Sequence, residues 1–172
     1  RAGYVTNLNG SEGSVSIIGA VSPQGGDFSE PVTQNTKRFI RCFWALDKSL
    51  AYARHYPAIQ WLNSYSEYIG EVTDWYAQNV SPDIMEKRNK MMAILQEESS
   101  LMEIVKLIGA YVLPDSKKAT LEVAKTIRVG FLQQNAFHAD DTYVPLEKQN
   151  KMMDTILLFD KRIKECVEKG VV

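Results

Sequence analysis

The chain has 172 residues, of which 45% are hydrophobic, and its 20 Lys and Arg nearly balance its 21 Asp and Glu, giving a net charge of −1. This charge excludes a protein held on nucleic acid mainly by phosphate contacts, and this apolar content excludes a disordered chain. Because no run of about 18 apolar residues without charges occurs, we expect no membrane-spanning helix. The sequence begins at Arg1 without a signal segment, and we expect it to be part of a longer chain.

The first 70 residues are rich in Gly, Ser, Thr and aromatic residues. Residues 14–21 form a β-branched run bounded by glycines, which predicts a buried strand. Residues 22–31 are expected to be a loop because of their Pro and Gly content. Residues 33–41 are expected to be a short helix with Thr33 as its N-cap.

A second apolar run and a proline follow. Residues 43–46 are predicted to be a strand, and residues 48–53 a short helical turn. Pro57 disfavours helical backbone at Tyr56, so we expect the chain to be extended there.

Helical periodicity dominates after residue 70. Ser81-Pro82-Asp83 predicts a helix start, with serine as cap and proline at the first helical position, and Gly109 predicts the end of that helix. A second helix is expected from Asp115, and a third after Pro145 that ends at Gly170. The positions expected to face the core are Met85, Met92, Leu95, Met102, Val105 and Ile108 in the first helix, Ala119, Val123, Ile127 and Phe131 in the second, and Met152, Ile156, Phe159, Ile163 and Val167 in the third.

The predicted fold is mainly α. An antiparallel helical bundle is expected over residues 71–172, preceded over residues 1–70 by the last strands and helices of an α/β domain. The methionines are expected to serve as adaptable core packing more than as a partner groove.

Polar clusters in the first 55 residues are weak candidates for chemistry. Residues 24–27 are glycine-rich but lack the Lys and Ser/Thr of a P-loop, so a conformationally special loop is favoured over a phosphate cradle. Asp27 and Glu30 are favoured as solvated charges over a catalytic carboxylate pair. Arg54 and His55 are favoured as surface or packed structure over an anion site.

The sequence shows no residue set with catalytic or metal-binding spacing. Cys42 and Cys166 are expected to be reduced structural thiols. The two histidines have no nearby metal ligands in the sequence. The acidic run Gln96-Glu97-Glu98 is expected to be the wet face of a helix. We therefore expect neither a catalytic residue nor a metal ligand in this chain.

An aromatic, amide-rich segment is the strongest candidate for a binding site. Phe131 and Phe137 flank an amide-rich linker at a helix end, and such a turn can hold a planar base by stacking and hydrogen bonds. Tyr56 lies in the other predicted domain, and ligand pockets favour domain junctions. An adenine-type site is one interpretation. The other is that these aromatic side chains hold the two domains together.

Several long motifs resemble the catalytic A subunit of V-type and A-type rotary ATPases. In the order of the family they are residues 13–34, 43–47, 50–62, 64–66, 94–98, 121–125 and 131–137. The resemblance covers nearly the whole chain, and residues 142–145 and 147–149 are more similar to prokaryotic members than to eukaryotic ones.

The resemblance implies the end of a RecA-like nucleotide-binding domain over residues 1–70 and a C-terminal helical domain over residues 71–172. It implies a cytoplasmic subunit, peripheral to the cell membrane, that alternates with B subunits in an A3B3 ring and contacts the central stalk. With a membrane ion-translocating sector, the complex would couple ATP hydrolysis or synthesis to proton or sodium transport. The full subunit would bind ATP or ADP with Mg²⁺, and no nucleic-acid partner is implied.

The resemblance also implies roles for individual residues. Tyr56 would pack on the adenine base, where family members often carry Phe, and Phe131 and Phe137 would form the other walls. The family's P-loop and Walker B motifs are absent from the sequence, so the chain alone is expected neither to hydrolyse ATP nor to bind nucleotide tightly. Residues 110–118 fall where the related F-type subunit carries an acidic rotor-contacting loop. Only Asp115 is acidic there, so rotor contact is a hypothesis.

The alternative function is a helical protein–protein interaction module without a nucleotide role. The two functions differ in whether Phe131 contributes to ATP affinity: its replacement by Ala should weaken ATP binding only if the adenine site exists.

Overall fold

The structure is a computed structural model that describes residues 3–170. The chain divides into two compact units, residues 1–40 and 41–172. The mainly α fold class is confirmed, because helices dominate and the strands among the described residues are two to four residues long.

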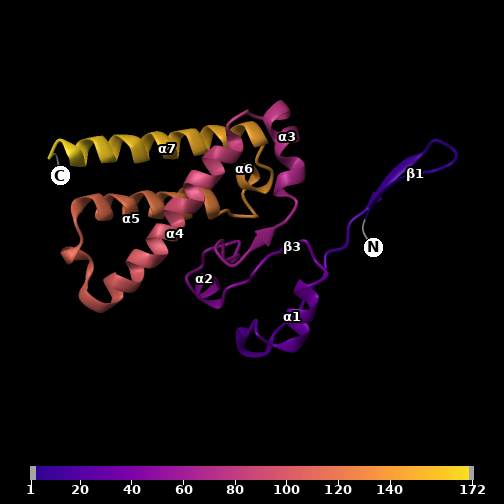
Figure 1. The fold of residues 1–172 in the computed structure, drawn as a ribbon, viewed down its shortest axis with the longest axis horizontal. Helices are drawn as coiled ribbons and strands as arrows, with labels where there is room; N and C mark the ends of the chain where they lie inside the picture. The colour runs from indigo at the N-terminus through magenta and orange to yellow at the C-terminus, as the bar shows by residue number, and fades with distance from the viewer. Residues whose placement is uncertain (1–2, 171–172) are drawn as a thin grey trace. The chain divides into compact units, whose positions relative to one another are not determined.

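The first unit holds a β-hairpin and a short helix (Figure 1). β1 (Gly3–Thr6) pairs antiparallel with β2 (Glu12–Val15), and Gly10 lies in the connecting turn with a φ of 80°, which a residue without a side chain adopts readily. After η1 (Gln24–Gly26), α1 spans Pro31–Lys37.

Two predictions for this unit are wrong. Residues 14–21 do not form a buried strand: β2 ends at Val15, residues 16–23 have no regular structure, and Ile18 is 85% exposed. A two-stranded hairpin has no second layer to cover its apolar side chains. The helix begins at Pro31, not at Thr33, because the fixed φ of proline suits the first helical position. Glu30 is the N-cap, and Thr33 is buried within the helix.

The second unit begins with short elements. They are β3 (Cys42–Phe43), α2 (Lys48–Tyr52) and β4 (Tyr65–Ser66), and β3 pairs antiparallel with β4. The predicted helical turn is confirmed as α2, which the Asp47 carboxylate caps by accepting two backbone N–H groups. The predicted strand over residues 43–46 is shorter than expected: β3 ends at Phe43, and Leu46 forms an isolated bridge with Ile59, which lies outside β4.

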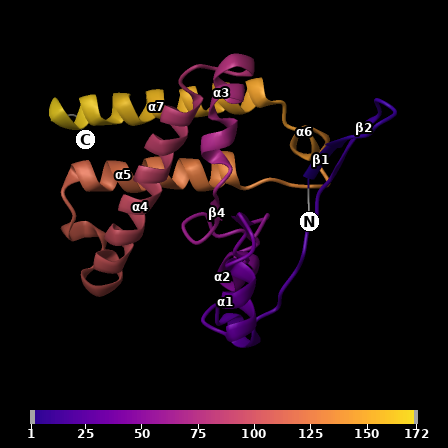
Figure 2. The same ribbon diagram turned by 45° about the vertical axis from the view of Figure 1, so that its right-hand side comes forward.

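Helices make up the rest of the second unit. They are α3 (Ile69–Asn79), α4 (Ile84–Ile108), α5 (Asp115–Ile127), α6 (Ala139–Thr142) and α7 (Leu146–Glu168), with the short turns η2 (Ala110–Val112) and η3 (Arg128–Leu132, a π-helical turn). Figures 1 and 2 show α5 and α7 side by side and antiparallel, with α4 crossing them, and all three helices pack on one another. The predicted antiparallel helical arrangement is confirmed.

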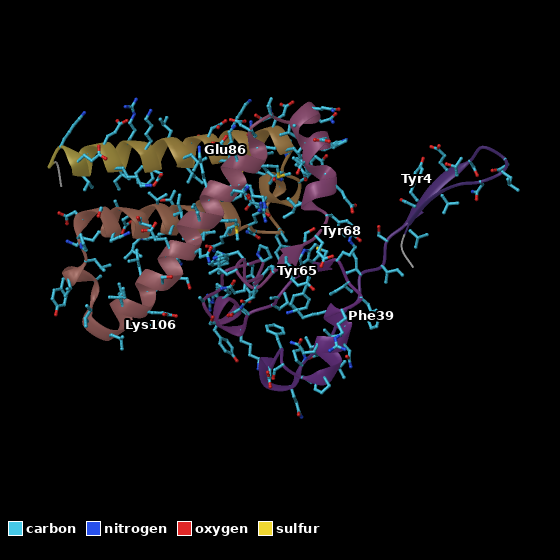
Figure 3. All side chains as sticks on the ribbon, in the orientation of Figure 1. Tyr4, Phe39, Tyr65, Tyr68, Glu86 and Lys106 are labelled. Atoms are coloured by element: carbon cyan, nitrogen blue, oxygen red, sulfur yellow. The ribbon has the colours of Figure 1, made fainter. Side chains whose placement is uncertain are left out.

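Glycine and proline set the helix ends largely as predicted. α4 ends at Gly109, because a φ of 86° is incompatible with a right-handed helix. α5 begins at Asp115, and α7 begins directly after Pro145 and ends before Gly170. Figure 3 shows Glu86 and Lys106 toward opposite ends of α4, so an acid lies near its N-terminus and a base near its C-terminus, which suits the helix dipole.

The start of α4 is later than predicted. Pro82 and Asp83 form a turn, and Asp83 is the N-cap residue. The Ser81 hydroxyl donates a hydrogen bond to the Asp83 carboxylate instead of accepting one from the helix backbone. A side chain that finds a closer partner does not cap the helix.

The core lies between α4, α5 and α7. Its buried members are Ile84, Met91, Ile94, Leu95, Val123, Ala124, Ile127, Met153 and Ile156. The predicted stripe on α5 is confirmed, and Met91 and Met153 confirm that methionine contributes to core packing. On α4 the prediction is confirmed at Leu95, which is buried, but elsewhere the buried face is shifted by one residue: Ile84 is buried, Met85 is half-buried, and Met102 is 38% exposed. One residue rotates a helix face by about 100°.

None of the described helices combines the length and apolar content that crossing a membrane requires.

Candidate functional site

Tyr56 lies in a bend after α2. Its ring is about half exposed (53%), and its hydroxyl lies 3.4 Å from the carbonyl oxygen of Ala51. The neighbouring His55 is buried and packs against Trp61, with 5.8 Å between the ring centroids. The chain is therefore anchored at His55 while the Tyr56 ring stays accessible to a ligand.

Phe131 lies in η3, the π-helical turn that continues α5. It is half-buried and packs against the core. It also lines a cavity of about 280 Å³, together with Leu132, Gln134, Val144, Gln149 and Met152. The cavity thus combines apolar walls with two amide side chains.

Phe137 is placed differently. Its ring is 98% exposed and lies outside the set of residues that line this cavity. Its backbone N–H donates to the Asn135 side-chain oxygen at 3.0 Å, in the loop between η3 and α6. Phe131 and Phe137 therefore belong to one short segment, one ring against the core and the other open.

A main-chain hydrogen bond joins this segment to Tyr56. The N–H of Gln134 donates to the carbonyl oxygen of Tyr56 at 2.7 Å, and the N–H of Gln133 donates to the carbonyl oxygen of Arg128 at 2.9 Å. Two stretches far apart in the sequence are therefore held together at the end of α5. The structure brings the predicted tyrosine and the predicted phenylalanine segment to one place in the second unit.

An ion pair lies next to this junction. Arg128, at the start of η3, pairs with Glu98 of α4 at 2.9 Å between Nη2 and Oε1. Burial raises the pKa of the Glu98 carboxyl, and the Arg128 guanidinium offsets part of that rise. Burial first, and the positive charge of Arg128 second, lower the pKa of His55, so this histidine is neutral at pH 7.

The prediction for the acidic run is wrong at Glu98. Glu97 is half-buried and pairs with Lys117 at 2.7 Å, but Glu98 is 7% exposed and faces the core. Helical spacing could have revealed it, because Glu98 lies four residues after Ile94 and three before Leu101, both of which are buried. An acid on the apolar stripe of a helix requires a cation, and Arg128 is that cation.

The glycine-rich loop of the first unit uses its acids internally. The Asp27 carboxylate accepts hydrogen bonds from the Ser29 N–H at 2.8 Å and the Ser29 hydroxyl at 2.6 Å, and these bonds lower its pKa. The Glu30 carboxylate accepts the N–H of Gln24 at 3.1 Å. Gly25, in the left-handed region at φ 67°, makes the turn. Both carboxylates therefore have a structural use within the loop.

Other candidate groups gather no metal site. Within residues 3–170, no group of three or more His, Cys, Asp or Glu side chains is arranged to hold a metal ion. Cys42 and Cys166 are exposed, and neither is in a disulfide.

A second cavity of about 180 Å³ includes Trp44, Trp61 and Arg88 in its lining.

Comparison with known families identifies both parts of the chain. The family model described as the ATP synthase alpha/beta family, nucleotide-binding domain, matches residues 1–66. The model described as the C-terminal domain of V and A type ATP synthase matches residues 73–172, more than half of the chain. The chain belongs to the V- and A-type ATP synthase family.

Curated relatives assign the chain to one region of this family's alpha chain, also called the A subunit. It is 63% identical over 171 residues to V-type ATP synthase alpha chain 2 of Clostridium tetani, covering 99% of the chain and 29% of the relative. It is 56% identical over 173 residues to the A subunit of the A-type ATP synthase of Methanopyrus kandleri, with the same two shares. The chain thus spans about 29% of the length of these relatives and corresponds to their C-terminal region.

A solved structure supports the fold. The ATP synthase subunit NeqB of Nanoarcheaum equitans superposes with a TM-score of 0.66 over 79% of this chain and 33% of its own, at 20% identity. In the V/A-type ATP synthase chain, Tyr56 lies in the range matched by the nucleotide-binding model, and Gln134 in the range matched by the C-terminal model. The hydrogen bond between them therefore links the two matched regions.

Proposed function

We propose that this chain is the C-terminal part of the catalytic A subunit of an ATP hydrolase or synthase, and that it supplies the adenine side of the nucleotide pocket. Residues 1–70 would be the end of the nucleotide-binding domain and residues 71–172 the helical domain. The observation that carries the proposal is the hydrogen bond from Gln134 to Tyr56, at 2.7 Å, between the two regions that the family models match. The alternative, a helical interaction module, has no need of this arrangement and is not favoured by the family match.

The three aromatic side chains fit a planar base. Tyr56 and Phe137 present exposed rings, and Phe131 stands against the core at the edge of the cavity. Stacking of a base on an aromatic ring contributes about 1–3 kcal/mol and needs no charge. Gln134 and Gln149 add amide groups nearby that can meet the polar edge of a base.

The phosphate chemistry would be supplied by other parts of the full protein. The 172 residues contain no G-x-x-x-x-G-K-[ST] motif, whose backbone and lysine hold the phosphates while its Ser/Thr binds Mg²⁺. We infer that ATP or ADP binds with Mg²⁺ in the full subunit, and that the chain alone neither hydrolyses ATP nor holds it tightly.

The proposed partners are those that the resemblance to the family implies. The full subunit would alternate with B subunits in an A3B3 ring, contact the central stalk, and act at the cytoplasmic face of the membrane on a sector that moves protons or sodium ions. The last turn of α4 and its connection to α5 are a candidate stalk contact, since Leu107 and Tyr111 are 84% and 83% exposed. Lys118 pairs with Asp115 at 2.8 Å, so an apolar surface and not an acidic loop would make this contact.

The adenine assignment is tested in the full subunit within its complex. Replacing Tyr56, Phe131 or Phe137 by Ala should weaken ATP binding by about 5- to 160-fold each, which is the loss of one stacking contact of about 1–3 kcal/mol. Phe159→Ala is the matched control, because this ring is 40% exposed on α7 and belongs to no part of the proposed pocket.

The measurement is the dissociation constant for ATP, by fluorescence titration or calorimetry. Unchanged affinity in all three variants would refute the adenine assignment and favour the interaction module. An equal loss in Phe159→Ala would show that the effect is general destabilisation.

A further inference from the structure

Phe137 is a large apolar ring in an exposed loop, and such a ring is useful for stacking only when its backbone is held. The loop connects η3 to α7 and contains the single turn of α6 (Figure 2). Of residues 135–143, all of which the structure describes, Asp141 alone is half-buried and the others are exposed. The apolar core therefore does not hold this loop, and polar contacts must do so.

Asp141 closes the loop. Its Oδ2 accepts the backbone N–H of Asn135 at 2.8 Å, across six residues. The side-chain oxygen of Asn135 accepts the N–H of Phe137 at 3.0 Å, and its backbone carbonyl accepts the N–H of His138 at 2.9 Å. A chain of hydrogen bonds thus runs from the Asp141 carboxylate through Asn135 to the residue that carries the exposed ring.

Thr142 completes the closure on the other side of Phe137. Its hydroxyl lies 3.0 Å from the carbonyl oxygen of Ala136 and 2.8 Å from that of His138, the residues on either side of Phe137. Both neighbours of the ring-bearing residue are therefore tied to α6, and the Asn135 end is tied to Asp141.

The adjacent acid has no such contacts. The Asp140 side chain is 78% exposed, and its carboxylate lies 3.9 Å from His138. Asp140 and Asp141 carry the same charge in the same helical turn. They differ in that the Asp141 carboxylate accepts a backbone N–H from the other end of the loop, which makes Asp140 a matched control.

We propose that Asp141 is a positioning residue of the nucleotide pocket: through Asn135 it fixes the loop that presents Phe137 to the adenine base. This rests on the proposed function, because it requires Phe137 to meet the base. A hydrogen bond to a carboxylate is stronger than one between neutral groups, so the loop loses its firmest closure when Asp141 is removed. A mobile ring must be ordered when ATP binds, and that cost appears as weaker binding.

The test uses the full subunit in its complex and measures KM and kcat for ATP hydrolysis. Asp141→Ala should raise KM for ATP by about 3- to 10-fold with kcat nearly unchanged, because a charge-assisted hydrogen bond is lost outside the reacting centre. Asp141→Asn should stay within about 2-fold of the parent, since the amide oxygen still accepts the N–H of Asn135. Asp140→Ala should behave like the parent. Asp141→Ser, whose hydroxyl is shorter, replaces the alanine variant if that variant fails to assemble.

Two further measurements separate positioning from general loosening. Ribose 5-triphosphate, which is ATP without its base, should show the same KM in the parent and in Asp141→Ala. In a Phe137→Ala background, Asp141→Ala should add little, because residues that act through one another are not additive.

The outcomes distinguish this inference from the proposed function. If Phe137→Ala raises KM for ATP but Asp141→Ala does not, or if the two effects add in full, the role of Asp141 is wrong and the adenine assignment stands. If Phe137→Ala leaves KM unchanged, the assignment of Phe137 to the base is wrong. A KM for ribose 5-triphosphate that rises as much as that for ATP would overturn the positioning role.

Discussion

The pair formed by Glu98 and Arg128 predicts an asymmetric effect on stability. The Glu98 side chain is 9% exposed and that of Arg128 is 34% exposed, with 2.9 Å between their charged atoms. Arg128→Met leaves a carboxylate inside the protein without its cation. Glu98→Gln leaves a guanidinium that water can partly reach, and the glutamine oxygen can still accept its hydrogen bond.

The magnitudes follow from this difference in exposure. Removing one partner of a buried pair costs about 3–5 kcal/mol, and we take the lower end, about 3 kcal/mol, for Arg128→Met because Arg128 is partly hydrated. Glu98→Gln exchanges a charged hydrogen bond for a neutral one and should cost about 1 kcal/mol. A loss of about 3 kcal/mol corresponds to a fall in Tm of about 6–12 °C for a domain of this size.

The assay is urea and thermal unfolding of the chain, followed by helical circular dichroism. The pH dependence adds a second readout: burial raises the pKa of Glu98, and Arg128→Met removes the charge that opposes this rise. At a pH above the Glu98 pKa of the unfolded state, the folded variant binds a proton at Glu98 that the unfolded variant does not. The loss of unfolding free energy caused by Arg128→Met should therefore shrink as the pH falls from about 7 toward about 5. A loss in Glu98→Gln equal to or larger than that in Arg128→Met would refute this account of the pair.

Two further predictions concern pH and backbone conformation. Burial and the charge of Arg128 lower the pKa of His55, so on acidification the unfolded state takes up a proton before the folded state does. The free energy of unfolding should therefore fall as the pH drops below about 6.5. In urea titrations at several pH values, His55→Gln should reduce this pH dependence, and the same substitution at the exposed His138 should not. Gly109 and Gly170 both have positive φ, but an added Cβ would lie 2.7 Å from the Tyr111 ring at Gly109 and meets nothing within 4 Å at Gly170. Gly170→Ala should therefore cost about 1 kcal/mol and Gly109→Ala clearly more in thermal unfolding, and equal costs would show that the Tyr111 contact is unimportant.

Much of the helical architecture could be predicted because its signals are local. Gly109 and Gly170 mark helix ends, and Pro145 marks a start, through properties of the residue itself. The spacing of Ala119, Val123 and Ile127 identifies the buried face of α5 without knowledge of its partner. These predictions need no information from elsewhere in the chain.

The failures arose where the outcome depends on distant neighbours. Residues 14–21 have the composition of a buried strand, but a strand is buried only where another layer covers it, and Ile18, beyond the end of β2, is 85% exposed. Glu98 was expected on a wet face because its sequence neighbours are polar, while its cation, Arg128, is thirty residues away. The methionines of α4 tolerate a rotation of the buried face, so they did not settle its register.

The sequence predicts the aromatic residues of the candidate site, but not the hydrogen bonds that hold them in place. Tyr56, Phe131 and Phe137 came from aromatic composition and family motifs, and their contact with adenine stays a prediction. The hydrogen bonds that arrange them involve backbone atoms of Gln134 and the carboxylate of Asp141, and composition carries no signal for either.

The bond between Gln134 and Tyr56 has a consequence for how this junction can diverge. It uses an N–H and a carbonyl oxygen, which every residue but proline provides, so it survives almost any substitution at either position. The side chain at residue 56 can then change, for example from Tyr to Phe, while the distance between the two segments is retained. The main-chain hydrogen bond thus preserves the geometry of the junction, while substitutions can change the aromatic side chains that it positions.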